Sequence, residues 1–133
     1  MKNFDELYRI ADEARKRAHA PYSKITVGSA LLCKSGKIYT GANIENSAFS
    51  PSVCAERVAF FSAVHAGERE FVAIAVAGGK ENGHAKACFP PCGVCRQVMA
   101  EFCSDDFKVV FGPDAVKNFS ELLPCGFSEN DLK

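Results

Sequence analysis

The sequence has no excess of charge of either sign: its 133 residues carry 16 Lys and Arg against 16 Asp and Glu. No cluster of basic residues stands out along it either. Proteins that bind polynucleotides usually present a basic patch or stripe to the phosphates. The balance therefore argues against a nucleic-acid partner, and against an enzyme that edits bases within DNA or RNA. It favours a small, weakly charged ligand.

Long apolar runs, repeats and linkers are also missing. No apolar stretch is long enough to cross a bilayer, and residues 1–20 are polar and amphipathic rather than typical of a signal peptide. We therefore expect a cytoplasmic protein without membrane contact. Residues 1–133 are predicted to form one domain, which at this length buries about two-thirds of the surface that its unfolded chain exposes.

Cysteine, by contrast, is present at seven positions: 33, 54, 88, 92, 95, 103 and 125. An odd number without a regular spacing suits a reducing compartment and metal-bound thiolates better than a set of disulfides. Cys54 stands two residues before Glu56, and Cys92 and Cys95 form a C-x-x-C pair after Pro91. A separate group, Cys33, Cys103 and Cys125, is expected to act as small buried hydrophobes.

The pattern C-x-E followed by P-C-x-x-C predicts a hydrolytic zinc centre. Structural zinc sites fill all four positions with protein ligands, whereas catalytic sites keep one position for water. Thiolates of Cys54, Cys92 and Cys95 would leave one position open on a single Zn²⁺, and Glu56 could move protons there. Two alternatives remain: Cys88 could be a fourth thiolate that closes a structural site, or Cys92 and Cys95 could form a redox pair.

Hydrophobic periodicity predicts alternating helices and strands. The predicted helices run from a capping box at Asn3 and Glu6 to a stop before Pro21, then over 54–66 and 92–102; the predicted strands are 25–33, 37–43, 71–77, 108–111 and a short 115–119. This alternation implies a sheet between helices. Two helix N-termini would then favour thiolates at the metal. Arg57 and Arg96 are expected to add positive charge near the sulfurs.

Taken together, the motifs resemble those of the small, zinc-dependent cytidine deaminases of the homotetrameric kind. The matching blocks are residues 20–24, 27–28, 41–46, 54–57, 91–97 and 121–124, together with Phe127. The resemblance implies an α/β fold, a three-layer α/β/α sandwich with a mixed sheet of about five strands. It also implies a homotetramer with active sites shared between subunits.

The resemblance further implies hydrolytic deamination of cytidine and 2′-deoxycytidine to uridine and 2′-deoxyuridine plus ammonia, as in pyrimidine salvage. In such enzymes zinc-bound hydroxide attacks C4 of the base while a glutamate, here Glu56, shuttles the proton. The first alternative is a deaminase of another aminated pyrimidine-like nucleoside, such as an antibiotic. A structural zinc-binding module is the alternative from a different class.

The resemblance also assigns substrate contacts. Asn43 and Glu45 would hold the ribose 3′-hydroxyl, and Ala55 would contact the base through its backbone. Ile25 stands where relatives often have Phe, so the base would contact an aliphatic side chain in place of a stacked ring. Phe49 stands where they commonly have Tyr, so a hydroxyl that could bond the nucleoside or a neighbouring subunit is lost. Phe127 is retained, and in relatives it reaches the base from another subunit.

Overall fold

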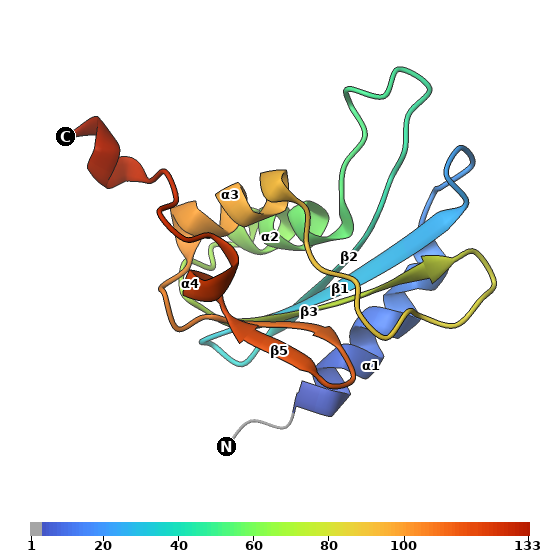
Figure 1. Cartoon of the computed structure of the whole chain (residues 1–133), viewed down its shortest axis with the longest axis horizontal. Coiled ribbons are helices and arrows are strands. Elements are labelled where there is room, and N and C mark those ends of the chain that lie inside the picture. Colours follow the sequence, from blue (N-terminus) through green and yellow to red (C-terminus); the bar gives the residue numbers. More distant parts are fainter. Residues whose placement is uncertain (1–3) are drawn as a thin grey trace.

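A mixed five-stranded sheet forms the centre of the computed structural model, which describes residues 4–133 (Figure 1). The helices are α1 (Phe4–Ala14), α2 (Ala55–His65), α3 (Gly93–Phe102) and α4 (Phe119–Leu122); the strands are β1 (Ile25–Cys33), β2 (Ile38–Ala42), β3 (Phe71–Lys80), β4 (Lys108–Gly112) and β5 (Ala115–Asn118); 3₁₀ turns span Arg15–Arg17 and Glu129–Leu132. The strand order is β2-β1-β3-β4-β5. Among the strand pairs within residues 4–133, only β3–β4 is parallel. The predicted mixed sheet is confirmed.

Helices cover both faces of this sheet, with α1 on one face and α2 and α3 on the other (Figure 1). The sequence of β3 explains why both faces can be covered. Its small residues Ala73, Ala75 and Ala77 pack with Leu7 and Ala11 of α1. The side chain of Ile74 points the other way, into the cluster built around α2 and α3. A strand that is apolar on both sides is buried on both sides, which gives the predicted three-layer sandwich.

The start of α2 is fixed closely against β1 and β2. A Cβ atom on Gly41 would lie 2.2 Å from the carbonyl oxygen of Ala55, so only glycine lets the helix approach β2 this closely. From β1, the buried hydroxyl of Ser29 donates a hydrogen bond of 2.9 Å to the same carbonyl. These two contacts determine where Cys54, the residue before α2, lies on the sheet.

Two boundaries differ from the sequence prediction by more than one residue, and one helix was missed. Helix α1 ends at Ala14 rather than just before Pro21, because the Arg15 side chain is buried and donates to the carbonyl oxygens of Thr26 and Lys80. Strand β3 continues to Lys80 because its last residues pair with the start of β1. The four-residue helix α4 was not predicted. Asn3, and with it the predicted capping box, lies outside the described residues.

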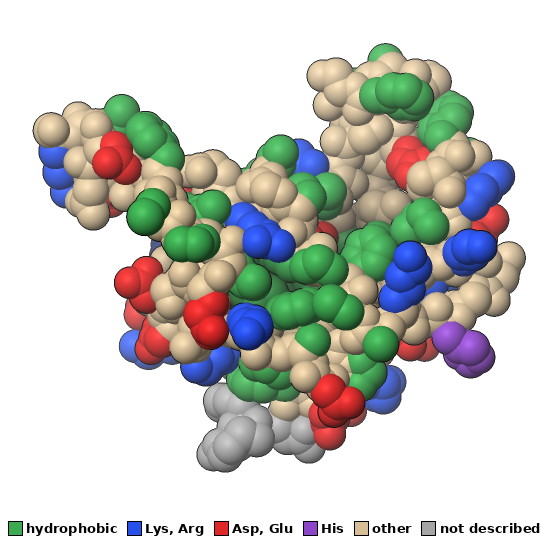
Figure 2. Space-filling model, in the orientation of Figure 1, with side chains coloured by type: hydrophobic (Ala, Val, Ile, Leu, Met, Phe, Trp, Pro, Cys, Tyr) green, Lys and Arg blue, Asp and Glu red, His purple; other side chains and the backbone are tan. Residues whose placement is uncertain are grey.

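Two segments project from the sandwich: the loop of residues 44–53, and the C-terminal arm of residues 123–133 (Figure 1). The base of the loop is held by a bridge between Ile44 and Val53. Figure 2 shows apolar side chains gathered in the hollow between the two projections, with acidic and basic side chains interspersed around it. Within residues 4–133, no helix combines the length and apolar character needed to span a membrane.

Candidate metal centre

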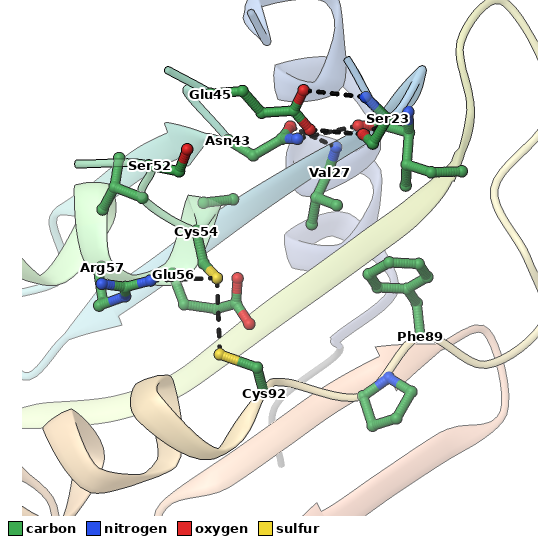
Figure 3. Close-up of a pocket in the computed structure, with 14 residues that line it drawn as sticks. Ser23, Val27, Asn43, Glu45, Ser52, Cys54, Glu56, Arg57, Phe89 and Cys92 are labelled. Atoms are coloured by element: carbon green, nitrogen blue, oxygen red, sulfur yellow. Dashed lines mark hydrogen bonds between the residues drawn. The ribbon is translucent and has the colours of Figure 1, made fainter. Parts of the chain in front are cut away.

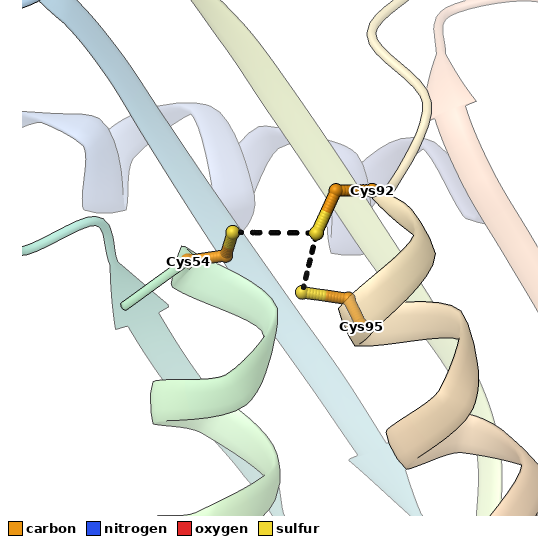
Figure 4. Close-up of side chains that lie close together, drawn as sticks. All are labelled: Cys54, Cys92 and Cys95. Carbon is orange, nitrogen blue, oxygen red and sulfur yellow. Dashed lines mark hydrogen bonds between the residues drawn. The ribbon is translucent and has the colours of Figure 1, made fainter. Parts of the chain in front are cut away.

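Three thiols meet where α2 and α3 begin (Figure 4). The Sγ atoms of Cys54 and Cys92 are 3.5 Å apart, and those of Cys92 and Cys95 are 3.6 Å apart. All three sulfurs lie within 4.8 Å of one another, and all three cysteines are free. Residues far apart in the sequence therefore present three soft ligands to one point.

This arrangement fits a zinc ion. Zn–S bonds of about 2.3 Å in a tetrahedral site place pairs of sulfurs about 3.8 Å apart, close to the separations observed. Cys88, the possible fourth thiolate, is exposed and is not part of the cluster among the described residues. Three sulfurs without a fourth protein ligand are the donor set of an open, catalytic zinc site.

The surroundings of the thiols are electropositive. Cys54 and Cys92 are the N-cap residues of α2 and α3, so both helix N-termini, with their partial positive charge, face the sulfurs. The Arg57 Nη2 atom lies 3.4 Å from the Cys54 Sγ atom. Hydrogen bonds from Cys95 and Arg57 lower the pKa of Cys54 to about 5. The pKa of Cys95 is raised, chiefly by its hydrogen bond with Cys54.

Glu56 is a buried acid next to these thiols. Its side chain is 3% exposed, and burial raises its pKa to about 7. Figure 3 shows the carboxyl group pointing into the pocket beside the Cys54 and Cys92 sulfurs. A carboxyl group with a pKa near neutrality can both accept and release a proton, as general acid–base catalysis requires.

A cavity of about 300 Å³ opens beside the thiols (Figure 3). Its size is at the lower end of the range for small-molecule sites. Sequence-predicted residues that line it are Ile25, Asn43, Glu45, Cys54, Ala55, Glu56, Arg57 and Cys92. Cys54, Cys92 and Glu56 thus form one end, and Asn43 and Glu45 form the other.

Both residues at the polar end are already hydrogen-bonded within the chain. The Asn43 side chain is 9% exposed; its Oδ1 atom accepts from the Val27 amide at 2.8 Å, and its Nδ2 atom donates to the Ile25 carbonyl at 2.9 Å. This leaves one N–H of the amide for a ligand. Glu45 accepts hydrogen bonds from Tyr22 and Ser23, which lower its pKa; the Ser23 hydroxyl makes the largest contribution. Glu45 therefore stays ionised as an acceptor.

Four predicted site residues do not line this cavity. One of them, Cys95, is fully buried within the thiol cluster beside it. Phe49 is 75% exposed and packs edge-on against Tyr22, beside a second hollow that shares Ser23 and Glu45 with the first. Phe127 is 56% exposed on the C-terminal arm. The guanidinium of Arg96 is bonded to the carbonyl oxygens of Pro91 and Leu122, and not to a sulfur as Arg57 is.

Sequence reasoning missed several cavity residues. Ser23, Val27, Ser52, Phe89 and Pro90 also line it. Ser23 and Val27 lie within matched blocks, but only the folded chain shows that they face Glu45 and the cavity. Phe89 is placed by its amide, which donates to the Phe111 carbonyl at 2.8 Å, and no motif signals that contact.

Comparison with known proteins agrees with the cluster of thiols. The sequence profile of the cytidine and deoxycytidylate deaminase zinc-binding region matches residues 1–112. The chain belongs to this deaminase family. A cytidine deaminase of Sporosarcina psychrophila is 46% identical over 132 residues, which cover 96% of this chain and 93% of that protein. The resemblance inferred from the motifs is confirmed.

Structural similarity extends over nearly the whole deaminase fold. The crystal structure of a cytidine deaminase from Burkholderia pseudomallei has a TM-score of 0.85 and 39% sequence identity, covering 95% of this chain and all 100% of that one. A blasticidin-S deaminase of Bacillus cereus is 30% identical over 141 residues, or 98% of this chain and 100% of that protein. The family therefore includes a relative named for an antibiotic substrate.

Proposed function

We propose that this chain catalyses the hydrolytic deamination of cytidine and 2′-deoxycytidine, releasing ammonia. One observation carries the proposal: the buried carboxyl group of Glu56 lies beside three clustered thiols, at one end of a cavity whose other end is Asn43 and Glu45. Membership of the deaminase family and the 46% identity to a cytidine deaminase support it.

Cys54, Cys92 and Cys95 would hold the zinc ion. When bound, zinc would supply a Lewis acid that lowers the pKa of a water molecule at its open position. The three thiolates weaken that effect through their negative charge. The Arg57 guanidinium at 3.4 Å from Cys54 and the two helix N-termini offset part of this charge. The protein surroundings thus favour both the thiolates and the acidity of the water.

Glu56 would carry the protons. Its carboxylate would take a proton from the attacking water and deliver it to N3 of the cytosine ring. It would then transfer the proton of the new C4 hydroxyl to the amino group, which leaves as ammonia while the C4 carbonyl forms. The reaction consumes one water molecule, and the C4–N bond is replaced by a C4–O bond. A pKa raised by burial suits both halves of this task, because the group gains and loses a proton near neutral pH.

The substrate would lie along the cavity. Ile25 and Phe89 offer apolar contact to the base, and the backbone of Ala55 lies beside it. The ribose 3′-hydroxyl can donate to Glu45 and accept from the remaining N–H of Asn43. A free base lacks this hydroxyl, and leaving the buried N–H of Asn43 without a partner costs about 1–3 kcal/mol. Nucleosides should therefore be preferred to cytosine.

The assembly would be a homotetramer with shared sites. Phe127 does not line the cavity of its own chain, and Phe49 and Phe61 are 75% and 50% exposed. Exposed aromatic residues on two projections and on α2 are the kind of surface that protein interfaces bury. A second chain could then complete each cavity with its Phe127. Seven free cysteines are consistent with a reducing, cytoplasmic location.

Ultraviolet absorbance tests the reaction directly. The zinc-loaded protein should convert cytidine to uridine, and Glu56→Gln should retain zinc yet lose about 10²- to 10⁴-fold in turnover. Glu101→Gln, which changes an exposed carboxylate on α3, is the matched control and should keep full activity. Undiminished turnover in Glu56→Gln would remove the proton-transfer role. An inactive wild type with zinc bound would overturn cytidine as the substrate. A panel of aminated pyrimidine nucleosides that includes blasticidin S would then be used to find the compound that is deaminated.

A further inference from the structure

Arg96 lies on α3 directly after Cys95, yet its side chain turns away from the sulfurs. The Nε atom donates to the Pro91 carbonyl at 2.9 Å, and the Nη1 atom donates to the Leu122 carbonyl at 2.7 Å. One guanidinium therefore joins the turn before α3 to the end of α4. The planar fork of arginine can hold two carbonyls at once, which a lysine ammonium does less well.

The first of these bonds is one peptide from a metal-binding thiol. Pro91 is followed by Cys92, the N-cap residue of α3, whose side chain makes no capping hydrogen bond. The Arg96 amide also donates to the Cys92 carbonyl at 3.0 Å. Arg96 thus holds the chain on both sides of the Pro91–Cys92 peptide, through its side chain and its backbone.

The second bond reaches a well-anchored element. Phe119 of α4 is 6% exposed in the core, and its amide donates to the Phe107 carbonyl at 2.7 Å. A capping box between Asn118 and Glu121 closes the start of α4. The Leu122 carbonyl at its end is one of the groups that a helix leaves without an internal partner. Helix α4 is therefore a fixed point from which Arg96 can hold the turn.

Among the three thiols, Cys92 depends most on such support. Cys95 is fully buried. Ala55, the residue after Cys54, is held by the Ser29 hydroxyl and by the close approach of Gly41. Cys92, in contrast, is exposed and precedes its helix. We propose that Arg96 is a positioning residue of the metal centre, which ties the Pro91–Cys92 turn to the end of α4 and so holds the Cys92 thiol ready for the metal.

Zinc release tests this role without reference to turnover. In the full-length zinc-loaded protein, Arg96→Gln should release zinc to a chromogenic chelator faster, because loss of residues that orient metal ligands typically costs about 10- to 100-fold in affinity. Arg69→Gln is the matched control: its guanidinium also bonds two carbonyls, those of Val64 and Glu68 at 2.8 Å, but it lies just after the C-terminal end of α2, whereas the thiols lie at the N-terminal end. It should release zinc at the wild-type rate.

A cobalt spectrum provides a second readout. With Co²⁺ in place of zinc, Arg96→Gln should weaken or shift the thiolate-to-metal absorption, whereas Arg69→Gln should leave it unchanged. Arg96→Lys can hold only one of the two carbonyls, so its zinc-release rate and cobalt spectrum should lie between those of wild type and Arg96→Gln. It serves as the test variant if Arg96→Gln does not fold. Equal zinc release and identical cobalt spectra in the Arg96 variants and wild type would overturn the positioning role. So would faster release of the same size from Arg69→Gln.

The inference rests on the proposed ligand set, and the same experiment separates the two. A wild-type chain that binds no zinc overturns the proposed function, and the positioning role with it. A wild-type chain that binds one zinc, with unaltered release from the Arg96 variants, overturns the positioning role alone.

Discussion

Ser23 holds Glu45 through two different groups. Its hydroxyl donates to the Glu45 Oε2 atom at 2.5 Å, and its backbone amide donates to the Oε1 atom at 3.1 Å. The turn that presents these donors continues into Lys24, whose φ of 61° places it in the left-handed region. The carboxylate is therefore fixed in direction before any substrate arrives, which favours binding because less freedom is lost.

Ser23→Ala should raise KM for cytidine and leave kcat nearly unchanged. Loss of one hydrogen bond to a partly exposed carboxylate is worth about 1 kcal/mol, or about fivefold in KM. 3′-Deoxycytidine, which lacks the hydroxyl that Glu45 would bind, should show no such increase. Ser104→Ala removes a similar serine–carboxylate contact, to Asp106 at 2.5 Å, and is the control expected to match wild type. An equal increase in KM for both nucleosides would contradict the role of Glu45 as ribose acceptor.

Gly41→Ala should destabilise the fold and disturb the metal centre. The new methyl group would lie 2.2 Å from the Ala55 carbonyl and would push α2 away from β2. Overpacking of this kind costs about 1–3 kcal/mol in the free energy of unfolding. Urea denaturation of the metal-free protein measures this loss, and zinc stoichiometry measures the second effect.

Gly93→Ala is the matched control for this change. It places a methyl group on the first turn of the other metal-binding helix, where nothing lies within 4 Å of the new Cβ atom. Alanine there should be neutral or stabilising by up to about 1 kcal/mol. If both variants were equally stable, the close approach of Gly41 would not limit the fold.

The cysteines outside the metal centre should differ in reactivity. Cys88 and Cys125 are exposed, and the prediction that Cys125 is buried is wrong. Burial raises the pKa of the Cys33 thiol to about 11 and raises that of Cys103 as well. Iodoacetamide at pH 8 should therefore modify Cys88 and Cys125 first, as read by peptide mass spectrometry. Early modification of Cys33 in the folded protein would contradict its burial.

The raised pKa of the Cys33 thiol also predicts that the stability of the fold depends on pH. Cys33 has a higher pKa when folded, about 11, than its ordinary value of 9.0. Above about pH 9 the unfolded chain loses this proton while the folded chain keeps it, so the free energy of unfolding should fall as pH rises from about 9 to 11. Denaturation of Cys33→Ala over the same range should show a shallower fall. Parallel curves for the two proteins would exclude Cys33 as the cause.

Phe127→Ala should raise KM without dissociating the assembly, if Phe127 completes the cavity of a second chain. Leu132→Ala, on the same arm and 78% exposed, is the control expected to keep the wild-type KM. Mixed assemblies give the sharper test. The Glu56→Gln chain still carries Phe127, so co-assembly with Phe127→Ala chains should lower the KM of the remaining active sites. An unchanged KM in the mixture would place Phe127 outside the shared site.

The covered sheet could be predicted because it depends on short-range patterns, whereas its mixed strand directions and the zinc-binding family came from the resemblance of the motifs. The spacing of Cys92 and Cys95 specifies one helical turn, and the apolar run of β3 specifies a strand covered on both faces. The proton-transfer role of Glu56 and the substrate contacts of Asn43 and Glu45 stay predictions.

Other features depend on long-range contacts that no local pattern records. The direction of the Arg96 side chain is determined by the Leu122 carbonyl, 26 residues away. Strand β3 extends through Gly78 and Gly79 because they pair with β1, although two glycines usually indicate a loop. Likewise, Ser23 reaches Glu45 across 22 positions. Each of these features is determined by a contact between segments that are far apart in the sequence.

The sulfurs of Cys54 and Cys92 are 3.5 Å apart although the residues are 38 positions apart in the chain, with all of β3 between them. A metal ion bound to both acts as a reversible cross-link around a loop of that length. By the chain-entropy relation for disulfides, such a closure is worth about 4 kcal/mol against the unfolded state. The metal-loaded protein should therefore stay folded with substitutions that unfold the metal-free chain. Removing the metal with a chelator should unfold such variants while the wild-type chain stays folded.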